Sequence, residues 1–418
     1  MRAPEWTRPT VRGGFTAFAP DEPPAGSPPE GPGEEPPFVP PPGVIPDPAP
    51  GMQASSGDVV VLVGTTKGLF ALTAGPDRTG WTRSGPWFPG EEIAAAVLDT
   101  RGGRNRLLAG AMSWHFGPSV YTSDDLGDTW REPEPTTLRF PDDTGASVAR
   151  VWQLMPAADS QPDVVYAGVE PAALFRSDDG GTSFELDRGL WDHPHRPQWQ
   201  PGGGGLCLHT IVPDPTGGTR MGVAVSAAGF YRTLDGTSWE AANKGILPPF
   251  LPPPEPEFGQ CVHKVARHPT RPDTLFVQHH WGVYRSDDFG GTWTEIGEDK
   301  LPSTFGFPIV ADPNDPDTAY VIPLKSDFFR CAAEGKLRVF RTADGGETWK
   351  PTGTGLPDED AYLSVLRDGF GTDGMDPTGL YLGTRTGEVF GTNDGGATWS
   401  ELTRHLPPVL CVKAAVLA

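Results

Sequence analysis

Short apolar and aromatic runs recur along this chain, and each is followed by a polar turn that contains Asp and Gly. Six runs end in a pair of apolar or aromatic residues, namely Val120-Tyr121, Leu174-Phe175, Phe230-Tyr231, Val283-Tyr284, Val339-Phe340 and Val389-Phe390. Short runs bounded by turn residues are typical of β-strands. The polar turns repeat about every 50–56 residues, a period expected for a sheet of four strands. The pattern therefore predicts an all-β protein whose similar sheets surround an axis.

The polar turns share one phrase, Ser/Thr-x-Asp-x-Gly-x-Thr/Ser followed by Trp or Phe. In a tight turn, an Asp side chain accepts hydrogen bonds from nearby backbone N–H groups, and Gly supplies a positive φ. The aspartates of the phrase are Asp125, Asp179, Asp235, Asp288, Asp344 and Asp394, and the copy at Asp235 is one residue shorter than the others. These features indicate structural turns, so we assign no catalysis to the six aspartates.

The phrase resembles the Asp-box of bacterial-neuraminidase-like (BNR) repeats, and the resemblance covers most of residues 58–418. This superfamily includes sialidases, two-propeller xyloglucan hydrolases, sortilin-type receptors and photosystem assembly factors. The resemblance implies a β-propeller whose boxes lie on outer hairpins, away from the ligand. The chain looks like the single-propeller bacterial proteins called sialidase-like or glycosyl hydrolase-like, which are similar in size to the assembly factors. It contains no Phe-Arg-Ile-Pro phrase, so we do not expect true sialidase activity.

We predict a seven-bladed β-propeller of four-stranded antiparallel blades over residues 58–418. Residues 58–72 read as two strands around a Gly turn, but no innermost strand precedes them. The C-terminal run 409–417 supplies that strand, so its pairing with the N-terminal strands is expected to close the ring and remove exposed sheet edges. Residues 1–57 are predicted to be a disordered tail or linker, because sixteen prolines fall within residues 1–50.

The net charge of −21 and the lack of a basic run argue against nucleic-acid and anionic-membrane partners. The N-terminus lacks the apolar core of a secretory signal, and no stretch is long enough for a membrane span. Four cysteines without a CxxC spacing fit reduced thiols. We therefore expect a cytoplasmic protein, and a monomer, with the Pro-rich tail as a possible tether for a protein partner.

Histidines gather on one side of the predicted ring, the near face, where the innermost strands begin. His209 and His263 stand at the starts of two successive innermost strands, and each follows a Cys by two residues. Alternation along a strand puts each Cys and its His on the same side. His209 and His263 are predicted to bind zinc, copper or iron with a third imidazole from His280, or alternatively from His279, His115 or His195. The alternative is structural, since such histidines also cap backbone carbonyls.

Further polar and aromatic residues are expected on the near face. We predict catalytic acid–base roles for Glu170 and Asp327, and also for His209 and His263. Predicted substrate-binding residues are Trp114, His115, Arg150, Trp191, His193, His195, Lys264, Trp281, Arg330 and Arg385. Arginines suit anionic groups, and tryptophans suit sugar rings or other flat ligands. Rim packing and ordinary solvated charges are the alternative explanations.

Two functions remain open from the sequence. The first is a hydrolase or lyase that acts on a small molecule or glycan at the near face, with possible help from a metal ion. The second is a non-catalytic interaction or assembly scaffold, which would explain the Pro-rich tail and the lack of a compact catalytic motif.

Overall fold

The computed structural model describes residues 46–113, 117–131, 137–247 and 255–418. The helices in these residues are all single turns. There is one α-helix, α1 (Arg188–Trp191), and there are four 3-10 helices, η1 (Arg101–Gly103), η2 (Asp142–Thr144), η3 (Arg196–Gln198) and η4 (Ala333–Gly335). None of these helices has the length and apolar character needed to cross a membrane. The rest of the described chain is built from antiparallel sheets, so the all-β prediction is confirmed.

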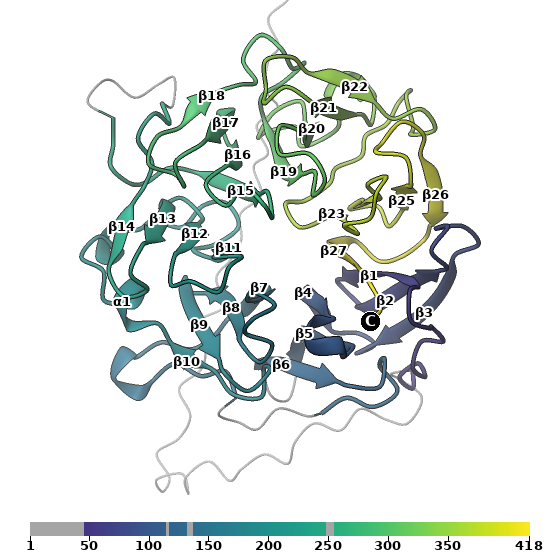
Figure 1. Ribbon diagram of the computed structural model, residues 1–418, viewed down its shortest axis with the longest axis horizontal. Helices are drawn as coiled ribbons and strands as arrows, with labels where there is room; N and C mark the ends of the chain where they lie inside the picture. The colour runs from purple at the N-terminus through teal and green to yellow at the C-terminus, as the bar shows by residue number, and fades with distance from the viewer. Residues whose placement is uncertain (1–45, 114–116, 132–136, 248–254) are drawn as a thin grey trace, which may run out of the picture. The chain divides into compact units, whose positions relative to one another are not determined.

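Seven sheets, or blades, form a ring, and the innermost strands β4, β7, β11, β15, β19, β23 and β27 surround its axis (Figure 1). We name each blade by its innermost strand. The β4 blade has three named strands, β4 (Glu92–Asp99), β5 (Arg106–Ser113) and β6 (Gly117–Ser123). A bridge between Thr122 and Arg131 marks its fourth position. The β7 blade contains β7 (Arg150–Pro156), β8 (Val165–Glu170), β9 (Ala173–Ser177) and β10 (Glu185–Leu186).

The next four blades follow in chain order around the ring (Figure 1). The β11 blade contains β11 (Leu208–Pro213), β12 (Met221–Val225), β13 (Gly229–Thr233) and β14 (Trp239–Ala241). The β15 blade contains β15 (Val262–Arg267), β16 (Leu275–His279), β17 (Gly282–Ser286) and β18 (Thr294–Glu295). The β19 blade contains β19 (Gly306–Ala311), β20 (Ala319–Pro323), β21 (Val339–Thr342) and β22 (Lys350–Thr352). The β23 blade contains β23 (Phe370–Thr372), β24 (Leu380–Gly383), β25 (Val389–Thr392) and β26 (Ser400–Thr403).

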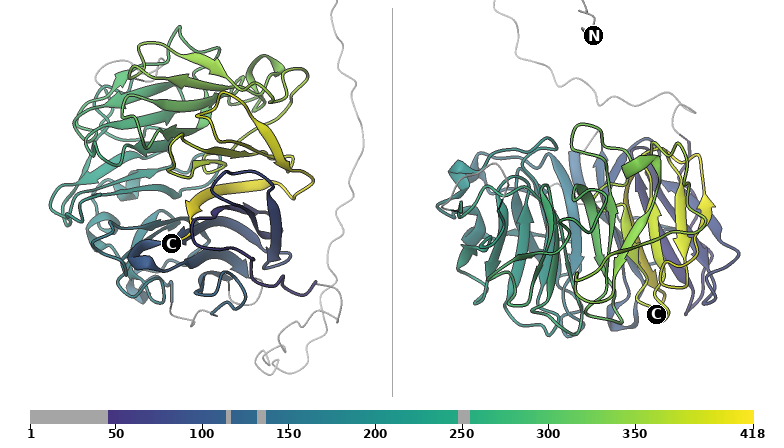
Figure 2. Two further views of the ribbon diagram at one scale, coloured as in Figure 1. Left: turned by 45° about the vertical axis from the view of Figure 1, so that its right-hand side comes forward. Right: turned by 90° about the horizontal axis from the view of Figure 1, so that it is seen from above.

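Both ends of the chain contribute to the last blade, as predicted. Its strand order is β27 (Val409–Val416), β1 (Val59–Thr65), β2 (Gly68–Ala74) and β3 (Thr82–Trp87). β27 pairs antiparallel with β1 from Val59 opposite Val416 to Thr65 opposite Val409. Figure 2 shows the C-terminal strand beside the N-terminal strands in this blade. The pairing gives β1 a hydrogen-bonded neighbour on each side, β27 and β2, and makes β27 the innermost strand of the blade.

The predicted boundary of the N-terminal tail at residue 57 lies close to β1, which begins at Val59. Met52 is nevertheless buried, and it packs with Trp87 and Leu126 in a core cluster. Its backbone N–H donates to the carbonyl of Leu126 at 2.9 Å. Part of the segment expected to be a linker therefore lies against the β4 blade, and residues 1–45 lie outside the described residues.

The Asp-box turns have the structural role that the sequence predicts. In the β15 blade, Ser286 Oγ donates to Asp288 Oδ1 at 2.7 Å, and the N–H of Thr292 donates to the same oxygen at 2.8 Å. Trp293 follows the turn and is buried, and its indole Nε1–H donates to the carbonyl of Ala242 in the preceding blade at 2.8 Å. The box thus closes one hairpin and ties it to the next sheet.

Strand direction separates the two faces of the ring. Innermost strands start at the near face, and antiparallel pairing brings the turns between second and third strands back to that face. The Asp-boxes follow the third strands, so they lie on the opposite face. Seen from the side, the strands run between these two faces (Figure 2).

We expect Trp293→Ala to lower the free energy of unfolding by about 3–5 kcal/mol, because it removes a buried ring and an inter-blade hydrogen bond. Trp293 is 4% exposed, and its ring lies 5.7 Å from that of Phe230, edge to face. Chemical denaturation at pH 7 measures the loss.

Phe328→Ala is the matched control, because Phe328 is 98% exposed. We expect this variant to stay within about 0.5 kcal/mol of the parent. Equal losses in both variants would show that the Asp-box tryptophan does not hold the blades together.

Candidate functional site

A cavity of about 520 Å³ lies at the axis on the near face. It is lined by the starts of innermost strands, such as Arg150 and Phe307, and by turns between second and third strands, such as the turn at His280. We call it the axial cavity. Blades that are far apart in the sequence contribute to it because all innermost strands converge on the axis.

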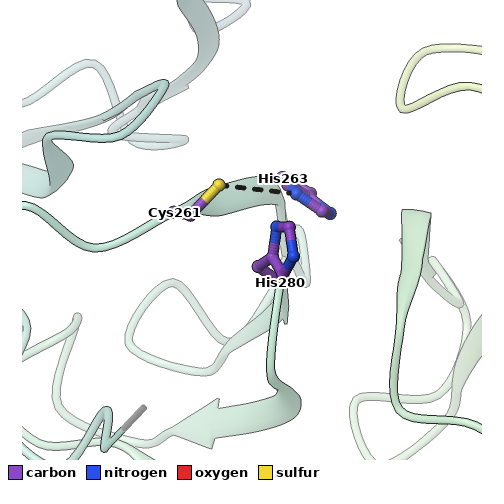
Figure 3. A group of neighbouring side chains, drawn as sticks. All are labelled: Cys261, His263 and His280. Carbon is purple, nitrogen blue, oxygen red and sulfur yellow. Dashed lines mark hydrogen bonds between the residues drawn. The ribbon is translucent and has the colours of Figure 1, made fainter. Parts of the chain in front are cut away.

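Three side chains of the β15 blade meet on one wall of the axial cavity, Cys261, His263 and His280 (Figure 3). One donor atom from each residue lies within 4.8 Å of the others, and the Cys261 Sγ is 3.6 Å from the His263 Nε2. Cys261 and His263 flank the first residue of β15, so alternation puts both on one side of the strand. The backbone N–H of His280 donates a hydrogen bond to the backbone carbonyl of Cys261 at 3.0 Å, which holds the turn against the strand.

Neighbouring groups fix both imidazoles. The His263 Nδ1 lies 2.6 Å from the carbonyl oxygen of Gly306, and its ring stacks on Phe307 at 4.8 Å. The His280 Nε2 lies 3.3 Å from Asp327 Oδ2. Burial lowers the pKa of both histidines, and for His280 the Asp327 carboxylate opposes part of that effect. Burial also raises the pKa of the Cys261 thiol, although Arg367 favours the thiolate.

Four arginines line the axial cavity, Arg150, Arg330, Arg367 and Arg385. Arg150 forms an ion pair with Glu92, with 2.9 Å between Nε and Oε1, and the Arg330 guanidinium lies over the Phe307 ring at 5.4 Å. Arg367 Nε and Arg385 Nη1 are buried and have no hydrogen-bond partner among the described residues. The predicted residues Arg150, Arg330 and Arg385 thus come together. Arg367 was missed because it precedes β23 in a loop without a motif.

One residue that lines the axial cavity is a buried carboxylate, Asp368. Asp368 Oδ1 accepts hydrogen bonds from Lys264 Nζ at 2.7 Å and from Lys413 Nζ at 2.8 Å. Burial alone would raise the pKa of Asp368, but the two lysines outweigh it and lower the pKa. Burial lowers the pKa of Lys264 to about 8, even though Asp368 opposes this shift. Lys264, predicted to bind substrate, links the β15 and β23 blades through Asp368, and Lys413 adds the last blade to this contact.

His209 does not join the other two predicted metal ligands. It is fully buried, and its Nε2 lies 3.0 Å from the carbonyl oxygen of Val262, while its Nδ1 lies 3.0 Å from Thr210 Oγ1. Both ring nitrogens are therefore occupied, Nδ1 by a neighbour within β11 and Nε2 by a contact that links β11 to β15. Cys261 stands in the place that the sequence assigned to His209. The sequence signal that could have pointed to Cys261 is the Cys-x-His spacing, which occurs both before His209 and before His263.

Glu170 orients a wall residue of the axial cavity and is not among the residues that line it. Glu170 Oε2 accepts a hydrogen bond from Trp152 Nε1 at 2.9 Å, and Trp152 lines the axial cavity. The Arg150 and Arg367 guanidinium groups lie 4.9 and 5.3 Å from the Trp152 ring. Asp327, the other predicted acid–base carboxylate, is beside His280, as described above.

Most other predicted near-face residues pack on the rim. His193 and His195 contact the Tyr231 ring, and His195 stacks on Phe258 at 4.2 Å. Trp191 stacks under the Arg196 guanidinium at 3.3 Å. Trp281 is 39% exposed, and its ring lies 4.5 Å from that of His280. Trp114 and His115, also predicted to bind substrate, lie outside the described residues.

A second cavity, of about 540 Å³, lies beside the boxes of Asp344 and Asp394. Both carboxylates accept hydrogen bonds within their own turns, from Thr348 and Thr398. These bonds lower the pKa of Asp344 to about 2. The carboxylates there serve the turns, so the axial cavity is the better candidate site.

Known proteins agree with this architecture. A family model described as BNR-Asp box repeat matches residues 283–296, which span the box of Asp288. The chain is a BNR-type β-propeller. This BNR-type propeller is 25% identical to xyloglucanase Xgh74A of Acetivibrio thermocellus over a segment that covers 59% of the chain. The chain spans about a third of the length of that curated relative, 31%.

Solved structures show the same fold. An ancestral GH74 enzyme aligns with a TM-score of 0.52 and 15% identity, over 75% of this propeller and 39% of that chain. A putative 6-phosphogluconolactonase from Bacteroides uniformis aligns with a TM-score of 0.51 and 11% identity, over 86% of this propeller and 99% of that chain. At these identities the structural likeness establishes the fold alone.

We expect Asp368→Asn to destabilise the protein by about 3–5 kcal/mol, because it leaves two buried ammonium groups without their counter-charge. The lowered pKa of Asp368 also sets the sign of the pH effect. Its contribution is present above about pH 4, the range of an unfolded Asp, and is lost as the pH falls below it. Unfolding free energies measured from pH 7 to pH 3 should therefore decline less steeply in the variant.

Lys413→Met is the control, because it keeps the pair between Lys264 and Asp368. We expect it to cost less than Asp368→Asn. A larger loss in Lys413→Met would contradict the central place given to the carboxylate.

Proposed function

We propose that the axial cavity binds a small anionic molecule or a charged glycan, and that the protein acts on it as a hydrolase or lyase. The observation that carries this proposal is the cluster of four arginines in a protein with a net charge of −21. Among the residues that the structure describes, only two carboxylates line the same cavity, Glu92 and Asp368, and Asp368 is already paired with two lysines. A positive cavity in an acidic protein attracts anions selectively.

Two guanidinium groups have donors to spare. Arg367 Nε and Arg385 Nη1 are buried without a partner in the described part of the chain. An unsatisfied buried donor costs about 1–3 kcal/mol, and more when it is charged. A carboxylate, phosphate or sulfate oxygen would satisfy these donors, and guanidinium groups suit such anions because of their planar fork.

The remaining walls suit an organic ligand rather than a bare ion. Trp152, Phe305 and Phe307 supply aromatic surface beside the arginines. A volume of about 520 Å³ lies within the range of about 300–1,000 Å³ that is common for small-molecule sites. The likeness to a xyloglucanase supports a carbohydrate as one form of the ligand.

His280 and Asp327 supply acid–base chemistry to the proposed reaction. A carboxylate beside an imidazole fixes its tautomer and stabilises the protonated form, which is the arrangement of a general base. Burial lowers the pKa of His280, and the Asp327 carboxylate opposes part of that shift. Glu170 acts in this proposal through Trp152, as a positioning residue.

A second candidate function is a protein-interaction scaffold. Phe328 is 98% exposed, Phe329 is 50% exposed and Tyr362 is 63% exposed. The rings of Phe329 and Tyr362 are in contact at 6.4 Å. Exposed aromatic residues of this kind are common at protein interfaces.

Binding assays with sugar phosphates, uronic acids and neutral xyloglucan oligosaccharides test the proposal. We expect calorimetry to detect acidic members of the panel, and Arg385→Gln and Arg367→Gln to weaken their binding about 10- to 100-fold through loss of a charge-assisted hydrogen bond. Release of product from the bound compounds then tests for hydrolysis or elimination.

Arg404→Gln is the control, because Arg404 is exposed and pairs with Glu401 outside the axial cavity. It should bind the acidic compounds as the parent does. Equal binding by all variants, or binding of the neutral sugars alone, would overturn the anion proposal. Binding of a protein that is lost in Phe328→Ala, without any small ligand, would favour the scaffold.

A further inference from the structure

We infer that Cys261, His263 and His280 bind one divalent transition-metal ion, with zinc as the best-suited metal, on the wall of the axial cavity. This inference does not depend on the anion binding proposed above, because the site would hold the ion without an organic ligand. With an ion bound, both nitrogens of His280 are occupied, so the acid–base role would fall to Asp327 alone. The inferred site replaces His209 in the predicted ligand set with Cys261. The three residues belong to one blade, so no movement between blades is needed to assemble them.

The spacing of the donor atoms suits a tetrahedral ion. With Zn–S at about 2.3 Å and Zn–N at about 2.0–2.1 Å, tetrahedral angles put sulfur and nitrogen about 3.5 Å apart. The Cys261 Sγ and His263 Nε2 are separated by 3.6 Å. All three donors lie within 4.8 Å of one another, so small rotations of the side chains are enough to bring them to one ion.

The contacts behind the ligands are those of a metal-bound imidazole. Ligating histidines usually donate their second ring N–H to a carbonyl or carboxylate, which fixes the tautomer. The His263 Nδ1–H donates to the Gly306 carbonyl at 2.6 Å, so the Nε2 lone pair faces Cys261. The His280 Nε2–H donates to Asp327 at 3.3 Å, which leaves the Nδ1 lone pair for the ion.

The donor set also decides the class of metal. One thiolate and two imidazoles favour zinc, cobalt or copper over magnesium and calcium, which prefer oxygen ligands. Three protein ligands leave a fourth position for water or an oxygen of a ligand, as in catalytic zinc sites. Arg330 and Phe307 line the same cavity, and the Arg330 Nε donates to the Asp327 carbonyl at 3.0 Å. The open position would therefore lie beside the groups that we propose bind an anion.

A competing explanation is a simple S–H···N contact between Cys261 and His263. That contact needs no ion and gives Cys261 no role in metal binding. The two explanations differ in what happens when a metal is added, because only the metal site converts the thiol to a metal-bound thiolate.

Cobalt titration separates these explanations. Full-length protein without a His-tag is freed of metal with EDTA and titrated with Co²⁺, and the thiolate-to-cobalt charge-transfer band is recorded. We expect one Co²⁺ per chain, displacement by an equivalent of Zn²⁺, and loss of the charge-transfer band in Cys261→Ser. His280→Gln should keep the thiolate band but weaken cobalt binding at least about 10-fold. Loss of a residue that only hydrogen-bonds to a ligand already lowers metal affinity about 10–100-fold, and His280 is itself a ligand.

Cys331→Ser is the matched control, because Cys331 is also a free, partly exposed cysteine but is absent from the group. It should bind cobalt as the parent does. An equal band in Cys261→Ser, or no thiolate band in the folded parent, would overturn the inference. Circular dichroism checks that each variant folds, and His280→Gln carries the test if Cys261→Ser does not. The titration contains no anionic compound, so failure of the proposed function would leave its result unchanged.

Discussion

The pairing of β27 with β1 is the constraint on which the rest of this molecule depends. It joins the two ends of the described chain, from Val59 opposite Val416 to Thr65 opposite Val409, and so closes the ring. Closure completes the last blade and places every innermost strand around one axis. Asp368 adds an electrostatic clamp at that axis, because it takes hydrogen bonds from Lys264 and from Lys413 of β27. The axial cavity exists because seven strand starts converge there.

Charge is distributed unevenly between the surface and the axis. The chain carries a net charge of −21, yet four arginines line the axial cavity. Two guanidinium nitrogens among them, Arg367 Nε and Arg385 Nη1, are buried without a partner in the described residues, and such a cost points to a ligand more than to a stabilising role. His280, which lines the same cavity, belongs both to the pair with Asp327 and to the group with Cys261 and His263. Recognition and chemistry would thus share a single cavity, with residues from several blades.

The similarity of this chain to known proteins supports its fold but leaves its activity open. Similarity to a xyloglucanase covers 59% of the chain and 31% of that enzyme. The fold itself hosts many functions, so activity has to be argued from the site. The arginines, the aromatic walls and the Cys/His group are particular to these residues, and they carry the proposals made above.

The amino-acid sequence by itself determined the blades and the Asp-boxes, because each depends on short-range chemistry repeated along the chain. It also indicated the closure, because the N-terminal strands lack an innermost strand and the C-terminal run supplies one. The box of Asp288 needs only residues 286–293, and its hydrogen bonds are local. The sequence also predicted that His263, His280, Asp327 and three of the four arginines would gather on one face. Only the tertiary structure decided which side chains meet. His209 turns to the Val262 carbonyl, and Asp368 joins lysines that are 104 and 45 residues away. Those choices depend on side-chain direction around a closed ring, which no local pattern encodes.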